Sequence, residues 1–100
     1  GSAERDQLLA QCAQVCQAGA RAVVLELVAA DTAAALTASA PAPTIGIGSG
    51  PHCDGQILVT HDLVGLTPWF KPGFVQPTAE LHRAFTTGVR AFIERTRAGD

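Results

Sequence analysis

Three short apolar runs, set between segments with helical spacing, constrain the fold of this chain more than any other feature. The runs "RAVVLEL", "TIGIG" and "GQILV" contain many β-branched residues and little charge, which is typical of strands buried on both faces. The first is predicted to form a strand from about Ala22 to Glu26, and a last amphipathic helix is predicted from Thr78 to about Arg97. Helices alternating with buried strands predict an α/β fold with about three parallel strands.

Three strands do not complete a parallel sheet. Both outer strands would leave unpaired backbone groups, which a stable protein covers or pairs. The sequence therefore predicts part of a barrel or part of a doubly wound sheet. We expect residues 3–100 to form a single domain, and Gly1 and Ser2 to be a scar left by expression.

Composition narrows the class of protein. The net charge is −2 and the lysines and arginines are thinly spread, so we expect no nucleic-acid partner. No apolar stretch reaches the roughly 18 residues of a membrane span, and we expect no membrane partner. Three cysteines without paired spacing predict a reducing, cytoplasmic location. Cys12 and Cys16 could bind zinc together with His52 or Cys53, but small buried residues are the favoured interpretation.

The glycine-rich stretch "PTIGIGSGPHCDGQILV" follows the second helical segment and contains the chain's densest cluster of chemical groups. It lacks the glycine offset of a dinucleotide fingerprint and the lysine of a phosphate loop. Its "HCD" offers three kinds of metal ligand, but adjacent residues seldom converge on one ion. The favoured interpretation is a backbone hinge, because glycines permit sharp turns and close approach.

Function in α/β folds sits at the carboxyl ends of the strands. Glu26 closes the first predicted strand there, and the glycines follow at the tip of the next one. A structural alternative for Glu26 is an ion pair with Arg21 or a cap on a neighbouring helix. The loop "TPWFKPGFVQP" is expected to be ordered, with Trp69, Phe70 and Phe74 packed against an apolar surface.

Longer motifs carry a resemblance to a known family. The segment "PTIGIGSGPHCDGQILVTHDLVGL" is similar to the signature of the ketopantoate hydroxymethyltransferase (3-methyl-2-oxobutanoate hydroxymethyltransferase) family. "AGARAVVLELV" resembles the strand that carries the catalytic glutamate of that family, and "PWFKPGFV" resembles its loop with proline and phenylalanine. The resemblance spans about Asp6 to Gly99. It implies a partial TIM barrel, a half-barrel of the phosphoenolpyruvate mutase/isocitrate lyase type, of which this chain supplies the C-terminal half.

The resemblance also implies a reaction, namely hydroxymethyl transfer from 5,10-methylenetetrahydrofolate to a 2-oxo acid in pantothenate biosynthesis. Glu26 matches the glutamate assigned as the base. Other positions match the loop beside the site, where we expect substrate-binding or loop-shaping roles, with Asp54 bonded to backbone N–H groups. These positions are Gly46, Gly48, Gly50, Asp54 and Gly55.

The family's Mg2+ ligands and substrate lysine have no counterpart in this chain, so no metal ligand is predicted here. Three hypotheses follow, the plainest of which is a truncated segment with no activity of its own. The chain is part of an enzyme if a complementary N-terminal half completes it, with a small 2-oxo acid as substrate. Alternatively, it is a non-catalytic or repurposed half-barrel, which self-associates as a homo-oligomeric interaction protein or performs a different enolate-type reaction.

Overall fold

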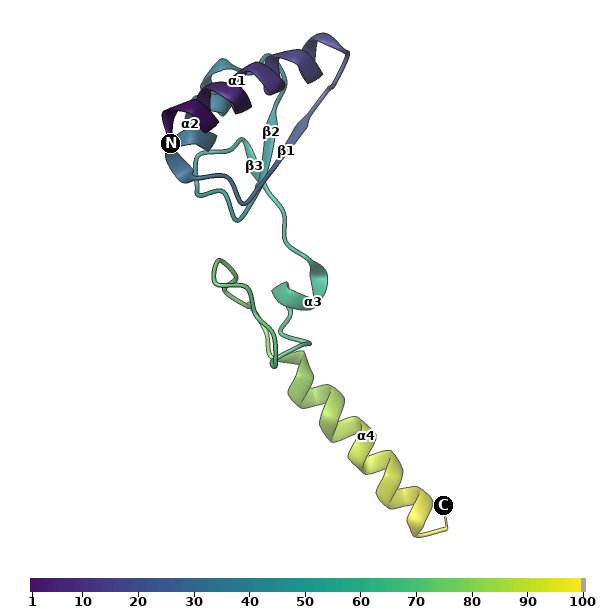
Figure 1. Ribbon diagram of the computed structural model, residues 1–100. Helices are drawn as coiled ribbons and strands as arrows, with labels where there is room; N and C mark the ends of the chain where they lie inside the picture. Colours follow the sequence, from purple (N-terminus) through teal and green to yellow (C-terminus); the bar gives the residue numbers. More distant parts are fainter. Residues whose placement is uncertain (100) are drawn as a thin grey trace. The chain divides into compact units, whose positions relative to one another are not determined.

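The computed structural model describes residues 1–99, which fall into two compact units. The first, Gly1–Ile57, holds a sheet and two helices, and the second begins at Leu58 (Figure 1). The elements of the first unit are α1 (Ser2–Gln17), β1 (Val23–Glu26), α2 (Ala30–Ser39), β2 (Thr44–Ile47) and β3 (Gly55–Gln56). Those of the second are α3 (Thr60–Leu63) and α4 (Leu81–Arg97). The single domain over residues 3–100 stays a prediction.

The sheet has the order β1-β2-β3, and both pairs of neighbouring strands are parallel. The predicted α/β class with three parallel strands and flanking helices is confirmed. The third strand is shorter than the apolar run "GQILV" suggested. Ile57 N still donates to Gly46 O at 3.0 Å, but β2 ends at Ile47, and Gly48 then turns away with φ +64°. Beyond Ile57, the third strand therefore has no neighbour with which to pair.

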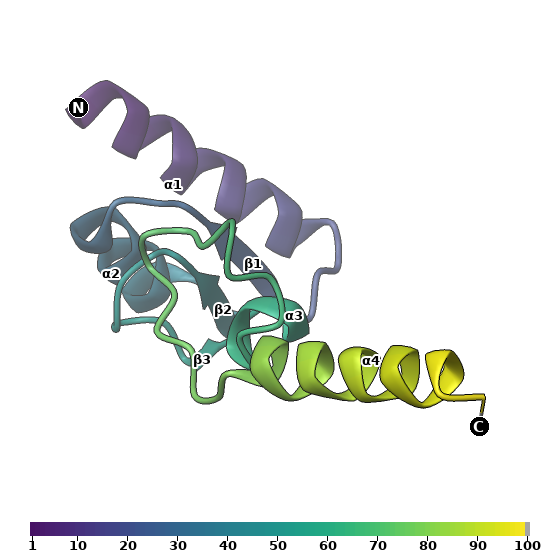
Figure 2. The same ribbon diagram turned by 90° about the horizontal axis from the view of Figure 1, so that it is seen from below.

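The core of the first unit lies on one face of the sheet. Leu25 of β1 is 6% exposed and packs in one cluster with Cys12 of α1 and with Ala33 and Leu36 of α2. Successive side chains of a strand point to opposite faces, so both helices cover the face to which Leu25 points. Figure 2 shows α1 and α2 with the sheet in a second view.

The opposite face of the sheet is apolar and open. Val24, which precedes Leu25 in β1, is 58% exposed, and Ile57, just after β3, is 46% exposed. Ile45 and Ile47 of β2 are half-buried and share this face, since they pair with Val24 and Glu26. Parallel sheets are normally covered on both faces. One face of the sheet is therefore covered by helices, and the other exposes apolar side chains to solvent.

In the second unit, the loop after α3 contradicts one expectation. Trp69 is 80% exposed and Phe70 is 67% exposed, so the prediction that the aromatic side chains pack against an apolar surface is wrong for this chain. The buried residue of the loop is Val75, at 2% exposure. Backbone bonds such as Val75 N to Pro72 O, at 3.0 Å, hold the turns instead. Prolines and turns order the loop's backbone without giving its aromatic rings a partner.

Helix α4 begins three residues later than predicted, because the preceding backbone is bonded to the end of α3. Thr78 N donates to Leu63 O at 2.8 Å, and Leu81 N donates to Val64 O at 2.9 Å. The predicted apolar stripe is present, but all of its residues are exposed: Leu81, Phe85, Val89, Phe92 and Ile93. Among residues 1–99, no helix combines the length and the apolar character needed to cross a bilayer.

Candidate functional site

Glu26 is the last residue of β1, and it pairs with Ile47, the last residue of β2. Its carboxylate therefore belongs to the carboxyl edge of the sheet, on the open face that Val24 shares. Glu26 is exposed, and within residues 1–99 it forms no ion pair, so the alternative pairing with Arg21 is not found. A catalytic role for this exposed carboxylate stays a prediction.

The turn that follows β2 lies at the same edge and depends on two glycines. Gly48 has φ +64° and Gly50 has φ +80°, values that other residues rarely adopt. A Cβ on Gly50 would lie 2.6 Å from Ala30 Cβ, at the first turn of α2. The structure thus brings Gly48 and Gly50 to the edge that carries Glu26.

Ser49, between these glycines, was not singled out from the sequence. Its side chain is 1% exposed, and its hydroxyl donates to Leu25 O at 2.7 Å while accepting from Val28 N at 3.0 Å. A serine between two glycines directly after a strand was the available signal. Its meaning depends on β1 lying beside β2, which composition and spacing do not show.

Three other predicted positions lie elsewhere in the sheet. Gly46 is in the middle of β2, where a Cβ would lie 2.8 Å from Cys53 Sγ. Asp54 Oδ2 accepts from Thr44 N at 2.8 Å, at the first residue of β2, and Gly55 follows. A strand of this length separates its ends by roughly 10 Å. Asp54 and Gly55 therefore lie toward the opposite edge from Glu26, and a substrate-binding role for them stays a prediction.

Asp54 belongs to a hydrogen-bonded network that includes the hydroxyl groups of Thr44 and Thr37. Its backbone N–H donates to Thr44 Oγ1 at 3.3 Å, and Thr44 Oγ1 lies 2.7 Å from Thr37 Oγ1. Thr37 Oγ1 donates to Ala33 O at 2.8 Å. Thr44 is fully buried, so these bonds satisfy polar groups that would otherwise be costly to bury. This network joins the start of β2 to α2 and to the loop before β3.

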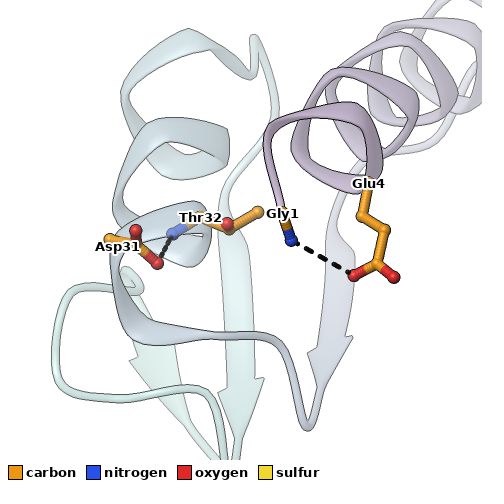
Figure 3. A network of polar contacts seen from close by, with 4 residues as sticks. All are labelled: Gly1, Glu4, Asp31 and Thr32. Atoms are coloured by element: carbon orange, nitrogen blue, oxygen red, sulfur yellow. Dashed lines mark hydrogen bonds and ion pairs between the residues drawn. The ribbon is translucent and has the colours of Figure 1, made fainter.

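A cavity of about 300 Å³ adjoins Glu26, and the first turns of α1 and α2 form part of its wall. Figure 3 shows the polar contacts at these helix starts. The Gly1 amino group lies 3.6 Å from Glu4 Oε2, and Asp31 Oδ1 accepts from Thr32 N at 2.8 Å. Both carboxylates lie where a helix N-terminus favours negative charge.

The second unit has a larger cavity of its own, of about 510 Å³. Five ionisable residues line it together with prolines and threonines: His61, Asp62, Lys71, Glu80 and His82. Positive and negative groups are mixed in this wall.

Comparison with known proteins identifies the chain. The family model described as ketopantoate hydroxymethyltransferase matches residues 1–100. The chain belongs to the ketopantoate hydroxymethyltransferase family.

Curated relatives agree with this assignment, and each bears the name 3-methyl-2-oxobutanoate hydroxymethyltransferase. The protein of Moorella thermoacetica is 46% identical over 97 residues, which are 97% of this chain and 36% of the relative. The proteins of Pelobacter propionicus and Prosthecochloris aestuarii are 42% and 46% identical over 96 residues, covering 36% and 35% of their own lengths. This chain therefore spans about a third of the length of the curated relatives it matches.

Within residues 1–99, no three His, Cys, Asp or Glu side chains come close enough together to hold a metal ion. Cys12 is buried, and Cys16 and Cys53 are half-buried free thiols. Burial raises the pKa of the Cys12 thiol, and the nearby Cys16 adds to this effect. A raised pKa disfavours the thiolate that would bind a metal.

Proposed function

We propose that this chain supplies the C-terminal part, about a third of the length, of a TIM barrel of the phosphoenolpyruvate mutase/isocitrate lyase type. The completed barrel transfers a hydroxymethyl group from 5,10-methylenetetrahydrofolate to a small 2-oxo acid, a step of pantothenate biosynthesis. Membership of the family supports this proposal, as does a parallel sheet with helices on one face and apolar side chains open on the other. In a barrel, that open face becomes the packed interior.

One observation carries the proposal, namely the place of Glu26. Its carboxylate stands at the carboxyl edge of β1, where TIM barrels build their active sites, and it has no ion-pair partner among the residues described. Glu26 acts as the general base, taking a proton from the carbon next to the carbonyl group of the 2-oxo acid. The enolate carbon would then form its new bond to the methylene carbon of 5,10-methylenetetrahydrofolate. Both bonds from that carbon to nitrogen break, water supplies the oxygen of the hydroxymethyl group, and tetrahydrofolate leaves.

Residues 1–99 bring no three His, Cys, Asp or Glu side chains together, so these residues alone do not form a binding site for Mg2+. We therefore propose that Mg2+ is bound by the part of the barrel outside this chain.

The partner in this proposal is a complementary N-terminal half, joined in the same polypeptide or supplied by another chain. It covers the face of Val24 and Ile57 and pairs the outer strands of the sheet.

All three cysteines are free thiols, which supports a cytoplasmic location.

A second candidate is self-association as a homo-oligomeric interaction protein, with or without a different enolate-type reaction. The observation in its favour is α4, whose apolar stripe is exposed along its whole length, with Phe85 at 66% and Phe92 at 62%. Exposed apolar patches of this kind mark interaction sites. Light scattering on the chain alone, and after mixing with the complementary half, separates the two candidates. The enzyme hypothesis predicts a defined complex of the two halves.

The test of the enzyme hypothesis is Glu26→Gln in the assembled protein, meaning this chain together with the segment that completes the barrel. We expect hydroxymethyl transfer to fall by about 100-fold or more, because Gln cannot take a proton. Glu94→Gln, on the exposed surface of α4, is the matched control and is expected to keep full activity. Equal rates in both variants would remove Glu26 from the reaction.

A further inference from the structure

Ser49 ties the turn after β2 to the end of β1. Its hydroxyl has one proton, which goes to Leu25 O at 2.7 Å, and its oxygen accepts from Val28 N at 3.0 Å. The first bond is to the peptide group directly before Glu26, and the second is to the peptide group between Leu27 and Val28, so together they span Glu26 and Leu27. The longer contact of Ser49 Oγ with Ile47 O, at 3.4 Å, is at best a weak bond.

The backbone that Ser49 holds is strained. Leu27, directly after Glu26, has φ +54°, and it is the only residue other than glycine in the described chain with positive φ. This conformation disfavours residues with a Cβ, and a bulky residue adopts it only where its surroundings enforce it. Leu27 N donates to Ile47 O at 2.9 Å, and Val28 N donates to Ser49. Two successive N–H groups are thus fixed by β2 and by the turn that follows it.

The turn that carries Ser49 is itself fixed. Gly50, with φ +80°, lets the backbone pass close to Ala30, and Gln56 Nε2 donates to Gly50 O at 3.0 Å. Ser49 is fully buried, so its hydroxyl has no water to exchange for these partners. The hydroxyl therefore acts as a fixed clamp between two rigid segments.

We propose that Ser49 is a positioning residue for Glu26, holding the strained Leu25–Val28 turn so that the carboxylate meets the substrate at one fixed angle. This inference rests on the proposed role of Glu26 as the base. Small errors in the placement of a catalytic group reduce rates strongly, by about 100-fold for 1 Å. A hydroxyl that touches no substrate can in this way control the rate.

The test is Ser49→Ala in the assembled protein, with Ser39→Ala as the matched control. Ser39 also donates through its hydroxyl to a backbone carbonyl, Leu36 O at 3.3 Å, but at the end of α2 and away from Glu26. We expect Ser49→Ala to lower kcat about 10- to 100-fold, with KM for the 2-oxo acid changed less than about twofold. Amide hydrogen exchange at Val28 should accelerate about tenfold, since its acceptor is gone.

Two further variants distinguish positioning from general loosening. In Glu26→Gln, adding Ser49→Ala should cause no further loss of kcat, because there is no base left to misplace. In Ser49→Ala, adding Leu27→Asn should recover part of the lost kcat, because Asn accepts the left-handed conformation that the clamp enforces. If Ser49→Ala fails to fold, Ser49→Cys keeps a weak donor and acceptor and is expected to show an intermediate kcat.

The outcomes separate this inference from the proposed function. Loss of kcat in Ser49→Ala that disappears in the Glu26→Gln background supports both. Full kcat in Ser49→Ala, while Glu26→Gln is inactive, overturns the positioning role and leaves the proposed function standing. Full activity in Glu26→Gln overturns both, even if exchange at Val28 accelerates. An additive loss in the double variant also overturns the positioning role.

Discussion

Large apolar side chains on helices are buried in one unit of this chain and exposed in the other. In the first unit, Leu36 of α2 is 1% exposed, and the hydroxyl of Thr44 is buried with partners in a hydrogen-bonded network. In the second, Phe85 lies on the apolar stripe of α4 and is 66% exposed. The apolar side chains of α2 pack against α1 and β1, whereas the apolar stripe of α4 has no packing partner among the residues described. The first unit has a hydrophobic core of its own, and α4 has an exposed apolar surface that another part of a protein could bury.

The largest effect should separate a core leucine from an exposed one. Leu36→Ala is expected to lower the free energy of unfolding by about 3 kcal/mol, because it leaves a cavity among α1, β1 and α2. Leu81→Ala, at a position that is 45% exposed, is expected to cost less than about 1 kcal/mol. Urea denaturation followed by circular dichroism measures both.

The same pair of variants sharpens the comparison when the rest of the barrel is present. If the missing half covers α4, the cost of Leu81→Ala should rise while that of Leu36→Ala stays the same. Equal costs for the two variants in the chain alone would mean that α4 is packed after all.

Replacing either of two glycines by alanine should have an intermediate effect on the free energy of unfolding, and the two effects should have opposite signs. Gly46→Ala is expected to cost about 1–3 kcal/mol, because the new Cβ would lie 2.8 Å from Cys53 Sγ inside the first unit. Gly88→Ala in α4 meets no atom within 4 Å and is expected to stabilise the helix by about 0.5–1 kcal/mol.

A second substitution checks the cause of the first effect. Cys53→Ala removes the sulfur that the new methyl group would meet, so it should restore most of the stability lost in Gly46→Ala. A Gly46→Ala protein that is as stable as its parent would show that β2 and the Cys53 loop separate easily. The midpoint of thermal unfolding is a sufficient measurement.

The smallest effect concerns the Cys12 thiol and pH. Burial raises the pKa of Cys12 above its ordinary value of 9.0, with Cys16 contributing. The stabilisation from the neutral thiol is complete below the ordinary value and is lost as pH rises through the raised pKa. The parent should therefore lose more stability than Cys12→Ala as the pH rises above the ordinary value of 9.0. Cys53→Ala, which keeps Cys12, should behave like the parent, and identical slopes in all three proteins would exclude the effect.

Much of the fold follows from local pattern. The two longer strands begin and end within a residue of the predicted bounds, and α4 was displaced only at its start. The hinge role of Gly48 and Gly50 could also be inferred, since few other residues adopt positive φ. The third strand and the aromatic loop could not be predicted in this way. The length of the third strand and the packing of the aromatic side chains depend on which segments lie beside them in space, and the local sequence does not specify those segments.

The sequence by itself determined the alternation of helices and strands, the place of Glu26 at a strand end, and the family, because each depends on the order of residues along the chain. Only the tertiary structure decided that Ser49 clamps the β1 turn, that Asp54 bonds at the opposite edge from Glu26, and that Leu27 is strained. These facts depend on parallel strand pairing, which brings together residues ten or 21 positions apart in a register that no local pattern encodes.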